Sequence, residues 1–240
     1  MTKVALFISG QPRFVDSISY KYIKQNILDK YDCDVFCHTW FDTTVEMSTA
    51  PWSGLNGFKC KGNELELIKT LYTPKAFTYD IPLKNEDIDI SHFKYVENPK
   101  TPFILTSMYT SMKRCFQNFL DYYAGNPPKY DVYIRLRYDI IPTVIPDLNT
   151  LETEMMYFVH HHGDRPVLAN NMIISTSFKG ITLLMNVLDK LNHFGDLGYK
   201  INDEEVIYYL ITGENMAHKK IKREYFKDIL PQELNFKIYE

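Results

Sequence analysis

The segment from Tyr130 to Asp139, YDVYIRLRYD, ends a strand-like run with charged residues. On an extended chain, alternate residues point to the same side, so Arg135, Arg137 and Asp139 are expected to share one side. Placing two guanidinium groups and a carboxylate there is costly unless they have partners. One interpretation is an internal salt bridge in which Asp139 neutralises an arginine. The other places Arg137 against a phosphate group and Asp139 on a divalent metal ion that bridges two phosphates.

A second candidate is the turn SGQPR, which follows the first strand-like run. Gly10 would allow a close backbone approach, and Arg13 would supply a partner for an anion. The turn lacks the GxGxxG spacing of a dinucleotide-binding fold and is not a P-loop. A plain connection between a strand and a helix explains it equally well.

Histidines and acids later in the chain each have two interpretations. In the run VHHHGD, neighbouring strand residues point to opposite faces, so three adjacent histidines cannot converge easily on one ion; His160 or His162 could contact a phosphate or ligate a metal. Glu204 and Glu205 follow Asn202 in the first turn of a predicted helix, where the helix dipole stabilises carboxylates. That position explains them, and a general base facing an acceptor hydroxyl is the alternative.

Apolar patterning predicts the elements that would position these residues. A strand at Lys3–Gly10, a helix with apolar positions from Val15 to Ile27 and a strand at Cys33–Trp40 form a βαβ unit, hence a parallel pair. Ligands of such sheets bind beyond the carboxyl ends of the strands. The whole chain, 1–240, is expected to be one α/β domain. Further helices are expected at 63–72, 106–124, 180–192 and 202–212, and further strands at 75–81, 130–137, 155–160 and 171–176.

Composition narrows the function classes. The net charge of −3 and the isoelectric point near 6.2 give no electrostatic footprint for nucleic acid. No apolar run reaches membrane-spanning length, and the N-terminal run is too short for a signal peptide. The four cysteines show no zinc-like pairing with histidines, which favours reduced thiols. We therefore expect a soluble, cytoplasmic protein with no nucleic-acid partner.

Several segments occur in an order that resembles a known family. The chain is similar to small glycosyltransferase-like proteins of the GT-A type, found among bacterial surface-polysaccharide genes and in large DNA viruses. The similarity spans roughly Lys3 to Thr212, and SGQPR together with DVFCHTW is its most specific part. The matching segments are FISGQPR (Phe7 to Arg13), DVFCHTW (Asp34 to Trp40), SMYTSMKRC (Ser107 to Cys115) and YDVYIRLRYD, with looser matches at ANNMIISTS (Ala169 to Ser177) and NDEEVIYYL (Asn202 to Leu210).

The resemblance implies a fold and a set of site residues. The fold would be a GT-A, Rossmann-like domain with a central, mostly parallel mixed sheet flanked by helices. Arg137-Tyr138-Asp139 stands where most relatives carry the Asp-x-Asp signature that holds the metal, so an arginine replaces the first aspartate. Mn²⁺ or Mg²⁺ is the implied cofactor, with Asp139 and His160 as ligands. The implied nucleotide-sugar contacts are Ser9, Gly10, Gln11, Arg13, His38, Trp40, Ser107, Ser111, Arg114 and Asn171, and the implied catalytic groups are Arg137 and Glu204 or Glu205.

The resulting hypothesis is a glycosyltransferase, hexosyl or pentosyl, that moves a sugar from a UDP- or GDP-type donor to a glycan or another hydroxyl acceptor. It depends on the guanidinium–carboxylate cluster after the fourth strand being left unpaired within the protein, free to hold a pyrophosphate. One alternative is a non-catalytic protein of the same fold that binds a nucleotide or a glycan. A less favoured alternative is a metal-dependent phosphoesterase or nucleotidyltransferase, since arginines rather than further carboxylates surround Asp139. The compartment would be the cytoplasm, or the host cytoplasm for a viral protein.

Overall fold

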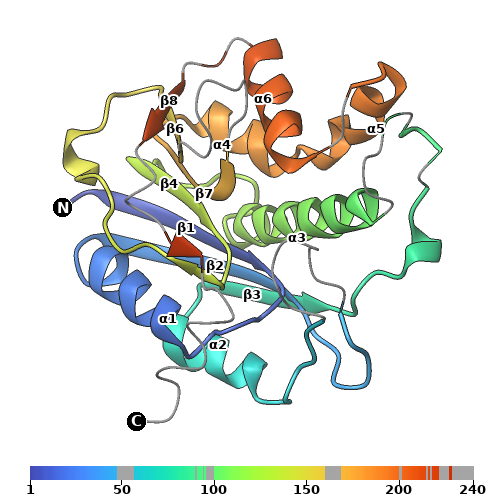
Figure 1. Cartoon of the computed structure of the whole chain (residues 1–240). Coiled ribbons are helices and arrows are strands. Elements are labelled where there is room, and N and C mark those ends of the chain that lie inside the picture. Colours follow the sequence, from blue (N-terminus) through green and yellow to red (C-terminus); the bar gives the residue numbers. More distant parts are fainter. Residues whose placement is uncertain are drawn as a thin grey trace.

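The structure is a computed structural model that describes residues 1–47, 57–89, 91–93, 95, 100–159, 169–199, 202–214, 216, 218–221 and 227–228. Its centre is a seven-stranded sheet in the order β3-β2-β1-β4-β7-β6-β8 (Figure 1). All neighbouring strands are parallel except at the two borders of β7, which are antiparallel. The strands are β1 (Lys3–Gly10), β2 (Asp32–Trp40), β3 (Ala76–Asp80), β4 (Val132–Leu136), β6 (Met156–Val159), β7 (Ala169–Ser175) and β8 (His218–Ile221), and β5 (Ile140–Ile141) pairs separately with β9 (Lys227–Asp228).

Helices cover both faces of the sheet (Figure 1). On one face lie α1 (Ile18–Ile23), which continues as the π-helical η1 (Lys24–Leu28), and α2 (Glu64–Tyr72). On the other face lie α3 (Thr101–Tyr122), α4 (Phe178–Met185), α5 (Leu188–Asp196) and α6 (Asp203–Gly213). Short 3-10 turns occur at η3 (Asn85–Asp87) and η4 (Leu148–Thr150). Within the described residues, no helix is both long and apolar enough to cross a membrane.

The strand sequences explain the two layers. Phe7 of β1 and Phe36 of β2 point to the α3 face, and both rings meet Phe119 of α3 edge-on. The neighbouring residues in each strand, such as Leu6 beside Phe7 and Val35 beside Phe36, point to the opposite face and pack with α1 and α2. Both faces of these strands are therefore covered, which is why their sequences are continuously apolar. The predicted α/β fold, with a mostly parallel mixed sheet flanked by helices, is confirmed.

The parallel register places the polar turns together. Ile8 of β1 pairs with Cys37 of β2 and with Leu136 of β4, so these three strands run in register to the same edge. The predicted βαβ unit is thus confirmed. We call this edge, where β1, β2, β3 and β4 end, the carboxyl edge.

Three boundaries differ from the sequence-based prediction. Strand β4 ends at Leu136, because Arg137 to Asp139 form a turn before β5. The helix expected at 180–192 is two helices, since Asn186 caps α4 and bonds back to the Thr182 carbonyl. Helix α3 begins earlier than expected, with Pro102 in its first turn, a position that proline tolerates. Tyr122, counted in its apolar stripe, is 48% exposed.

Candidate functional site at the carboxyl edge

Two arginines converge on Asp139 at the carboxyl edge. Arg13, in the connection after β1, places its Nη2 atom 2.5 Å from Asp139 Oδ2. Arg137, directly after β4, donates from Nε to Asp139 Oδ1 at 2.8 Å and from Nη2 to Oδ2 at 3.2 Å. Two segments far apart in sequence are thereby joined through one carboxylate, as parallel pairing of β1 and β4 allows.

This pairing corrects one sequence-based expectation. The expectation that the cluster is left unpaired within the protein was wrong, because Arg137 and Asp139 contact each other. The cluster is nevertheless not sealed, since a quarter of the Arg137 side-chain surface is exposed (25%), against 9% for that of Asp139. Two guanidinium groups and one carboxylate thus gather at this edge, and part of the Arg137 side chain is open to solvent.

Electrostatics keep Asp139 ionised. Burial opposes its charge and acts to raise the pKa, but the charges of Arg13 and Arg137 outweigh burial and hold the pKa of this carboxyl well below its usual range. Asp139 is therefore a fixed anion at neutral pH. The direction of both arginine side chains is set by this anion.

The turn that carries the cluster is fixed by contacts with α1, η1 and α2. Tyr138, between the two charged residues, is fully buried and meets Tyr72 of α2 edge-on. Ser19 of α1 donates to the Ile140 carbonyl at 2.5 Å, and Asn26 of η1 donates to the Pro142 carbonyl at 2.7 Å. The turn after β4 and the helix after β1 are thus fixed to one another.

The end of β1 carries one buried hydroxyl that lacks a hydrogen-bond partner among the described residues. Ser9 is 1% exposed, and its hydroxyl has no hydrogen-bond partner among the described residues. Gly10 has φ +120°, a conformation that favours glycine, and a Cβ there would meet nothing within 4 Å. Gln11 accepts the Arg13 backbone N–H at 2.8 Å. A buried hydroxyl beside open space suits contact with a ligand.

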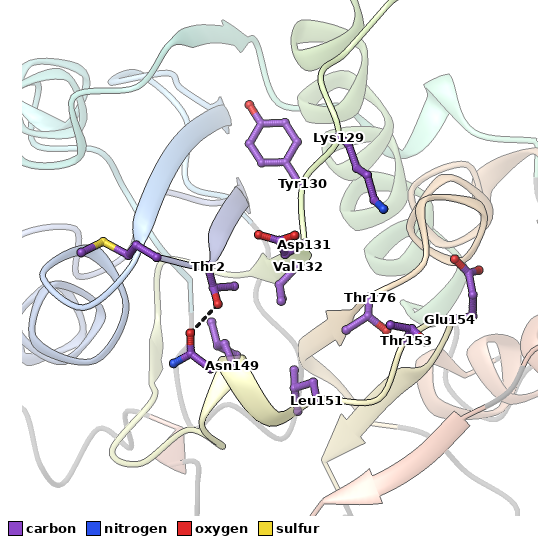
Figure 2. A pocket seen from close by; sticks show the side chains of 12 residues that line it. Thr2, Lys129, Tyr130, Asp131, Val132, Asn149, Leu151, Thr153, Glu154 and Thr176 are labelled. Carbon is purple, nitrogen blue, oxygen red and sulfur yellow. Dashed lines mark hydrogen bonds between the residues drawn. The ribbon is translucent and has the colours of Figure 1, made fainter.

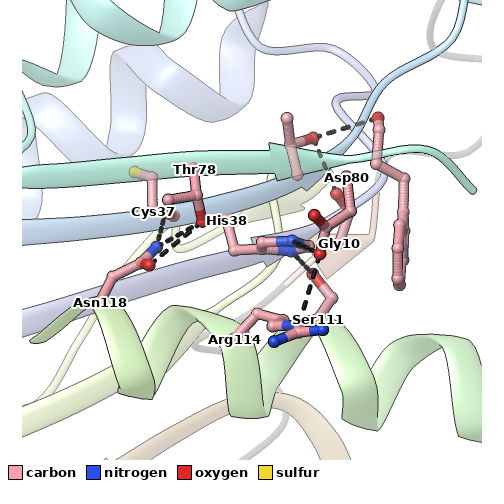
Figure 3. A network of polar contacts seen from close by, with 10 residues as sticks. Gly10, Cys37, His38, Thr78, Asp80, Ser111, Arg114 and Asn118 are labelled. Atoms are coloured by element: carbon pink, nitrogen blue, oxygen red, sulfur yellow. Dashed lines mark hydrogen bonds and ion pairs between the residues drawn. The ribbon is translucent and has the colours of Figure 1, made fainter. Parts of the chain in front are cut away.

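His38 lies inside a polar network between β2, β3 and α3 (Figure 3). Its Nε2 atom is 3.2 Å from Asp80 Oδ2, and its Nδ1 atom is 2.7 Å from the Ser111 hydroxyl. A carboxylate only accepts, so Nε2 carries the proton and Nδ1 accepts from Ser111. Burial lowers the pKa of His38 to about 4 despite its bond to Asp80, so the ring is neutral. Arg114 lies 3.4 Å from the same Asp80 oxygen.

The residues predicted to bind the nucleotide on β2 and α3 fall into a buried group and a more exposed group. His38 and Ser111 are fully buried and bind each other, so they position Asp80 rather than meet a ligand. Trp40 is 3% exposed and packs in a small apolar cluster with Met47. Arg114 is largely exposed, and Ser107 lies two turns earlier on α3, half-buried.

Asp80 is a site residue that the sequence analysis missed. It ends β3 at the carboxyl edge, and its side chain is 46% exposed although it binds both His38 and Arg114. The signal was available, because an acid at the end of a strand follows the same rule that singled out the ends of β1, β2 and β4.

Four predicted residues lie in parts of the chain that the structure describes incompletely or not at all. Asn171 lies in β7 next to Met172, which pairs with Leu136, so its backbone reaches the carboxyl edge. Glu205 is half-buried in the first turn of α6, and its N–H donates to the Asn202 side chain at 2.8 Å, which confirms the predicted cap. The side chains of Asn171 and Glu204, and all of His160, lie outside the described structure.

The described donor groups do not fit a divalent metal ion at this site. No group of three His, Cys, Asp or Glu side chains converges among the described residues. Asp139 already faces Arg13 and Arg137, whose charges repel a cation. Charge compensation for an anionic ligand is therefore assigned below to the arginines of this chain.

A separate cavity of about 510 Å³ lies at the opposite edge of the sheet (Figure 2). Its lining includes Thr2 before β1, Asp131 before β4 and Glu154 before β6, so it opens at the amino ends of the parallel strands. Asp131 accepts the Lys3 backbone N–H, and Thr2 bonds Asn149. This cavity is remote from the arginine cluster, and we do not assign the ligand site to it.

Comparison with known proteins adds a likeness in structure. No protein-family model matches the chain, and no curated protein matches it in sequence. Glycosyltransferase GlyE of Streptococcus pneumoniae TIGR4 matches with a TM-score of 0.45 and 10% identity, over 92% of this chain but only 45% of GlyE. Mouse xyloside xylosyltransferase 1 matches with a TM-score of 0.45 and 7% identity, over 92% of this chain and 85% of that one.

The galactosyltransferase LgtC, solved with donor and acceptor sugar analogues, matches with a TM-score of 0.42 and 8% identity, over 90% of this chain and 72% of that one. All three are glycosyltransferases, the class to which the sequence resemblance points. TM-scores and identities this low carry no argument about activity. The functional argument therefore rests on the residues of this chain.

Proposed function

We propose that this protein is a glycosyltransferase that uses a nucleoside-diphosphate sugar of the UDP or GDP type, with a glycan or another hydroxyl compound as acceptor. The observation that carries the proposal is the convergence of Arg13 and Arg137 on Asp139 at the carboxyl edge, where part of the Arg137 side chain is exposed. Arginine pairs well with phosphate oxygens because its donors form a planar fork. Ser9 and Gly10 offer further polar contacts beside it.

In the proposed reaction the acceptor oxygen attacks the anomeric carbon, and the bond from that carbon to the diphosphate oxygen breaks. The diphosphate leaves with an added negative charge, which Arg137 and Arg13 stabilise. If the reaction inverts the anomeric centre, Glu204 or Glu205 takes the acceptor proton. If it retains the configuration, an oxygen of the leaving diphosphate takes the acceptor proton on the same face of the sugar, and these acids serve only the start of α6.

Two rival functions have different support. A non-catalytic nucleotide- or glycan-binding protein is favoured by the pairing of Asp139 with both arginines, which resembles a binding clamp. A metal-dependent phosphoesterase or nucleotidyltransferase needs a cluster of metal-binding side chains, and the described residues offer none. The role of the arginines is the same for a hexose and for a pentose, and a cytoplasmic location is part of the proposal.

The test is release of nucleoside diphosphate from a panel of UDP- and GDP-sugars, measured by chromatography, with thermal unfolding recorded in the same samples. Slow hydrolysis of one donor together with thermal stabilisation by the matching nucleoside diphosphate supports the enzyme. Stabilisation without turnover, with or without added acceptors, supports the binding protein. If no nucleotide stabilises the protein and no sugar nucleotide is hydrolysed, the proposal is overturned.

A further inference from the structure

A cluster of aromatic rings lies at the surface where α5, α6 and the segment around Tyr95 meet. Tyr95 and Tyr199 are 65% and 39% exposed. The Tyr199 ring stacks on Tyr209 of α6, with centroids 4.4 Å apart and planes at 28°. Phe194, almost fully buried, contacts both stacked rings from the core side, at centroid distances of 5.9 and 6.4 Å. Tyr199 and Tyr209 are therefore a stacked pair of rings backed by the core, and Tyr95 lies nearby at the end of α5.

The end of α5 fixes the position of Tyr199. Gly198 has φ +76°, in the left-handed region that favours glycine. Its N–H donates to the Gly195 carbonyl at 2.9 Å, and the Tyr199 N–H donates to the Phe194 carbonyl at 3.0 Å. This pair of bonds is the Schellman arrangement that ends many helices. Tyr199 is therefore held against α6 by backbone geometry as well as by its ring contacts.

Two glycines bring a second segment onto this surface. A Cβ on Gly195 would lie 2.5 Å from the His92 carbonyl oxygen, and a Cβ on Gly198 would lie 3.3 Å from Tyr95 Cε2. His92 and Tyr95 can therefore lie directly against the last turn of α5 only because both positions lack a side chain. The exposed aromatic rings belong to one closely packed surface.

Polar groups border the rings. His92 Nδ1 lies 2.9 Å from Asp196 Oδ1, and His92 Nε2 lies 3.7 Å from Asp89 Oδ2. The Asp89 and Asp196 side chains are 67% and 56% exposed, and a carboxylate oxygen can accept more than one hydrogen bond from hydroxyl groups. Two carboxylates beside one histidine also disfavour a phosphorylated or otherwise anionic ligand at this surface.

We propose that this surface, the aromatic platform of Tyr95, Tyr199 and Tyr209 with its rim of Asp89, His92 and Asp196, binds a neutral glycan. A sugar ring has an apolar C–H face that can lie on a tyrosine, and hydroxyl groups at its edge that can reach the carboxylates. That the glycan is the acceptor rests on the proposed function.

The platform is linked to the candidate donor site through α3. Lys113 of α3 pairs with Asp189 of α5 at 2.5 Å, and the next residue, Arg114, pairs with Asp80 at the carboxyl edge. Figure 1 shows α5 toward the end of the sheet at which the arrowheads of β1 and β3 point. An acceptor on the platform would thus approach from the side on which the donor is proposed to bind.

The test is saturation-transfer NMR with lactose, maltotriose and xylotriose, on the wild type and on the variants Tyr95→Ala, Tyr199→Ala and Tyr199→Phe. We expect signal transfer to at least one sugar, a loss of at least fivefold in both alanine variants, and retention in Tyr199→Phe. Tyr122→Ala removes a tyrosine from the far end of α3 whose exposure of 48% lies between those of Tyr199 and Tyr95, and it serves as the matched control. Tyr95 is so exposed that its loss leaves folding intact.

Thermal stabilisation by UDP and GDP, measured on the same proteins, separates this inference from the proposed function. If sugar binding depends on Tyr95 and Tyr199 but no nucleotide stabilises the protein, the proposal of a glycan-binding platform is supported and the proposal of a glycosyltransferase is rejected. Nucleotide stabilisation together with no sugar signal in the wild type, or with alanine variants that bind sugar as well as the wild type, would overturn the platform.

Discussion

The guanidinium of Arg13 lies 2.5 Å from the carboxylate of Asp139, which joins the connection after β1 to the turn after β4. Arg137 contacts the same carboxylate from the other side. The carboxylate therefore determines where two positive side chains stand. Four predictions follow from this cluster and from the His38 network, beyond the test of the aromatic platform.

Replacing Arg137 by Gln should lower donor turnover by about 10²–10³-fold, because one charged donor to the leaving diphosphate is lost. The measurement is kcat/KM for donor hydrolysis with the best sugar nucleotide. Lys24→Gln, which removes one positive charge from an exposed ion pair with Asp29, is the matched control and should leave turnover unchanged. If Arg137→Gln is as active as the control variant, Arg137 does not stabilise the leaving diphosphate.

Replacing Asp139 by Asn should lower the free energy of unfolding by about 3 kcal/mol, because two arginines lose their buried counter-charge. Pyrophosphate or a nucleoside diphosphate should then raise the melting temperature more in Asp139→Asn than in the wild type, since it supplies the missing negative charge. Thermal unfolding with and without pyrophosphate measures both effects. Asp189→Asn, in an exposed ion pair with Lys113, should show neither. A variant that is destabilised but indifferent to pyrophosphate would argue against an anion site here.

Stability should depend on His38 between about pH 6.5 and pH 4. The pKa of His38 in the folded protein, about 4, lies below the ordinary histidine value of 6.5, so the unfolded chain binds the proton first as the pH falls. The stabilising contribution is complete above pH 6.5 and is lost progressively down to pH 4, by on the order of 3 kcal/mol. Urea unfolding at several pH values measures this slope.

The variant His38→Gln should lack that pH-dependent slope, while Asp80, Ser111 and Arg114 remain in place around it. His193→Gln, which removes an exposed histidine from α5, should keep the slope and serves as the control. A slope that survives in His38→Gln would assign the titration to another group.

Binding of a nucleoside diphosphate should persist when divalent metal ions are removed. Arg13 and Arg137 already supply positive charge at the carboxyl edge, and Asp139 is engaged by both. The rise in melting temperature caused by UDP or GDP should therefore change little between EDTA and Mn²⁺. Stabilisation that disappears in EDTA would show that a metal ion, and not the arginine pair, compensates the diphosphate.

Local patterns predicted the elements best. The continuous apolar run of β1, the strand β2 and the Asn202 cap of α6 are encoded within a few neighbouring residues, and all three are confirmed. The break between α4 and α5 was missed because apolar residues continue through it, while the decisive contact is the bond from the Asn186 side chain to the chain one turn earlier.

The site was harder to predict, because its contacts join distant segments. The sequence analysis singled out Arg137 together with Asp139 and found Arg13 in a separate turn, but the pairing of Arg13 with Asp139 depends on the register of β1 beside β4. His38 was expected near a nucleotide, whereas the position of Ser111 over it explains its burial. The aromatic platform has no sequence motif, since it results from close packing at two glycines.

The bonds from Ser19 and Asn26 to the backbone carbonyls after Asp139 give the arginine cluster a rigid foundation. Its electric field is therefore set when the chain folds, before any ligand arrives. An anion that binds there has few dipoles to reorient, and complexes with different nucleotides should share one unchanged arrangement of this corner of the molecule.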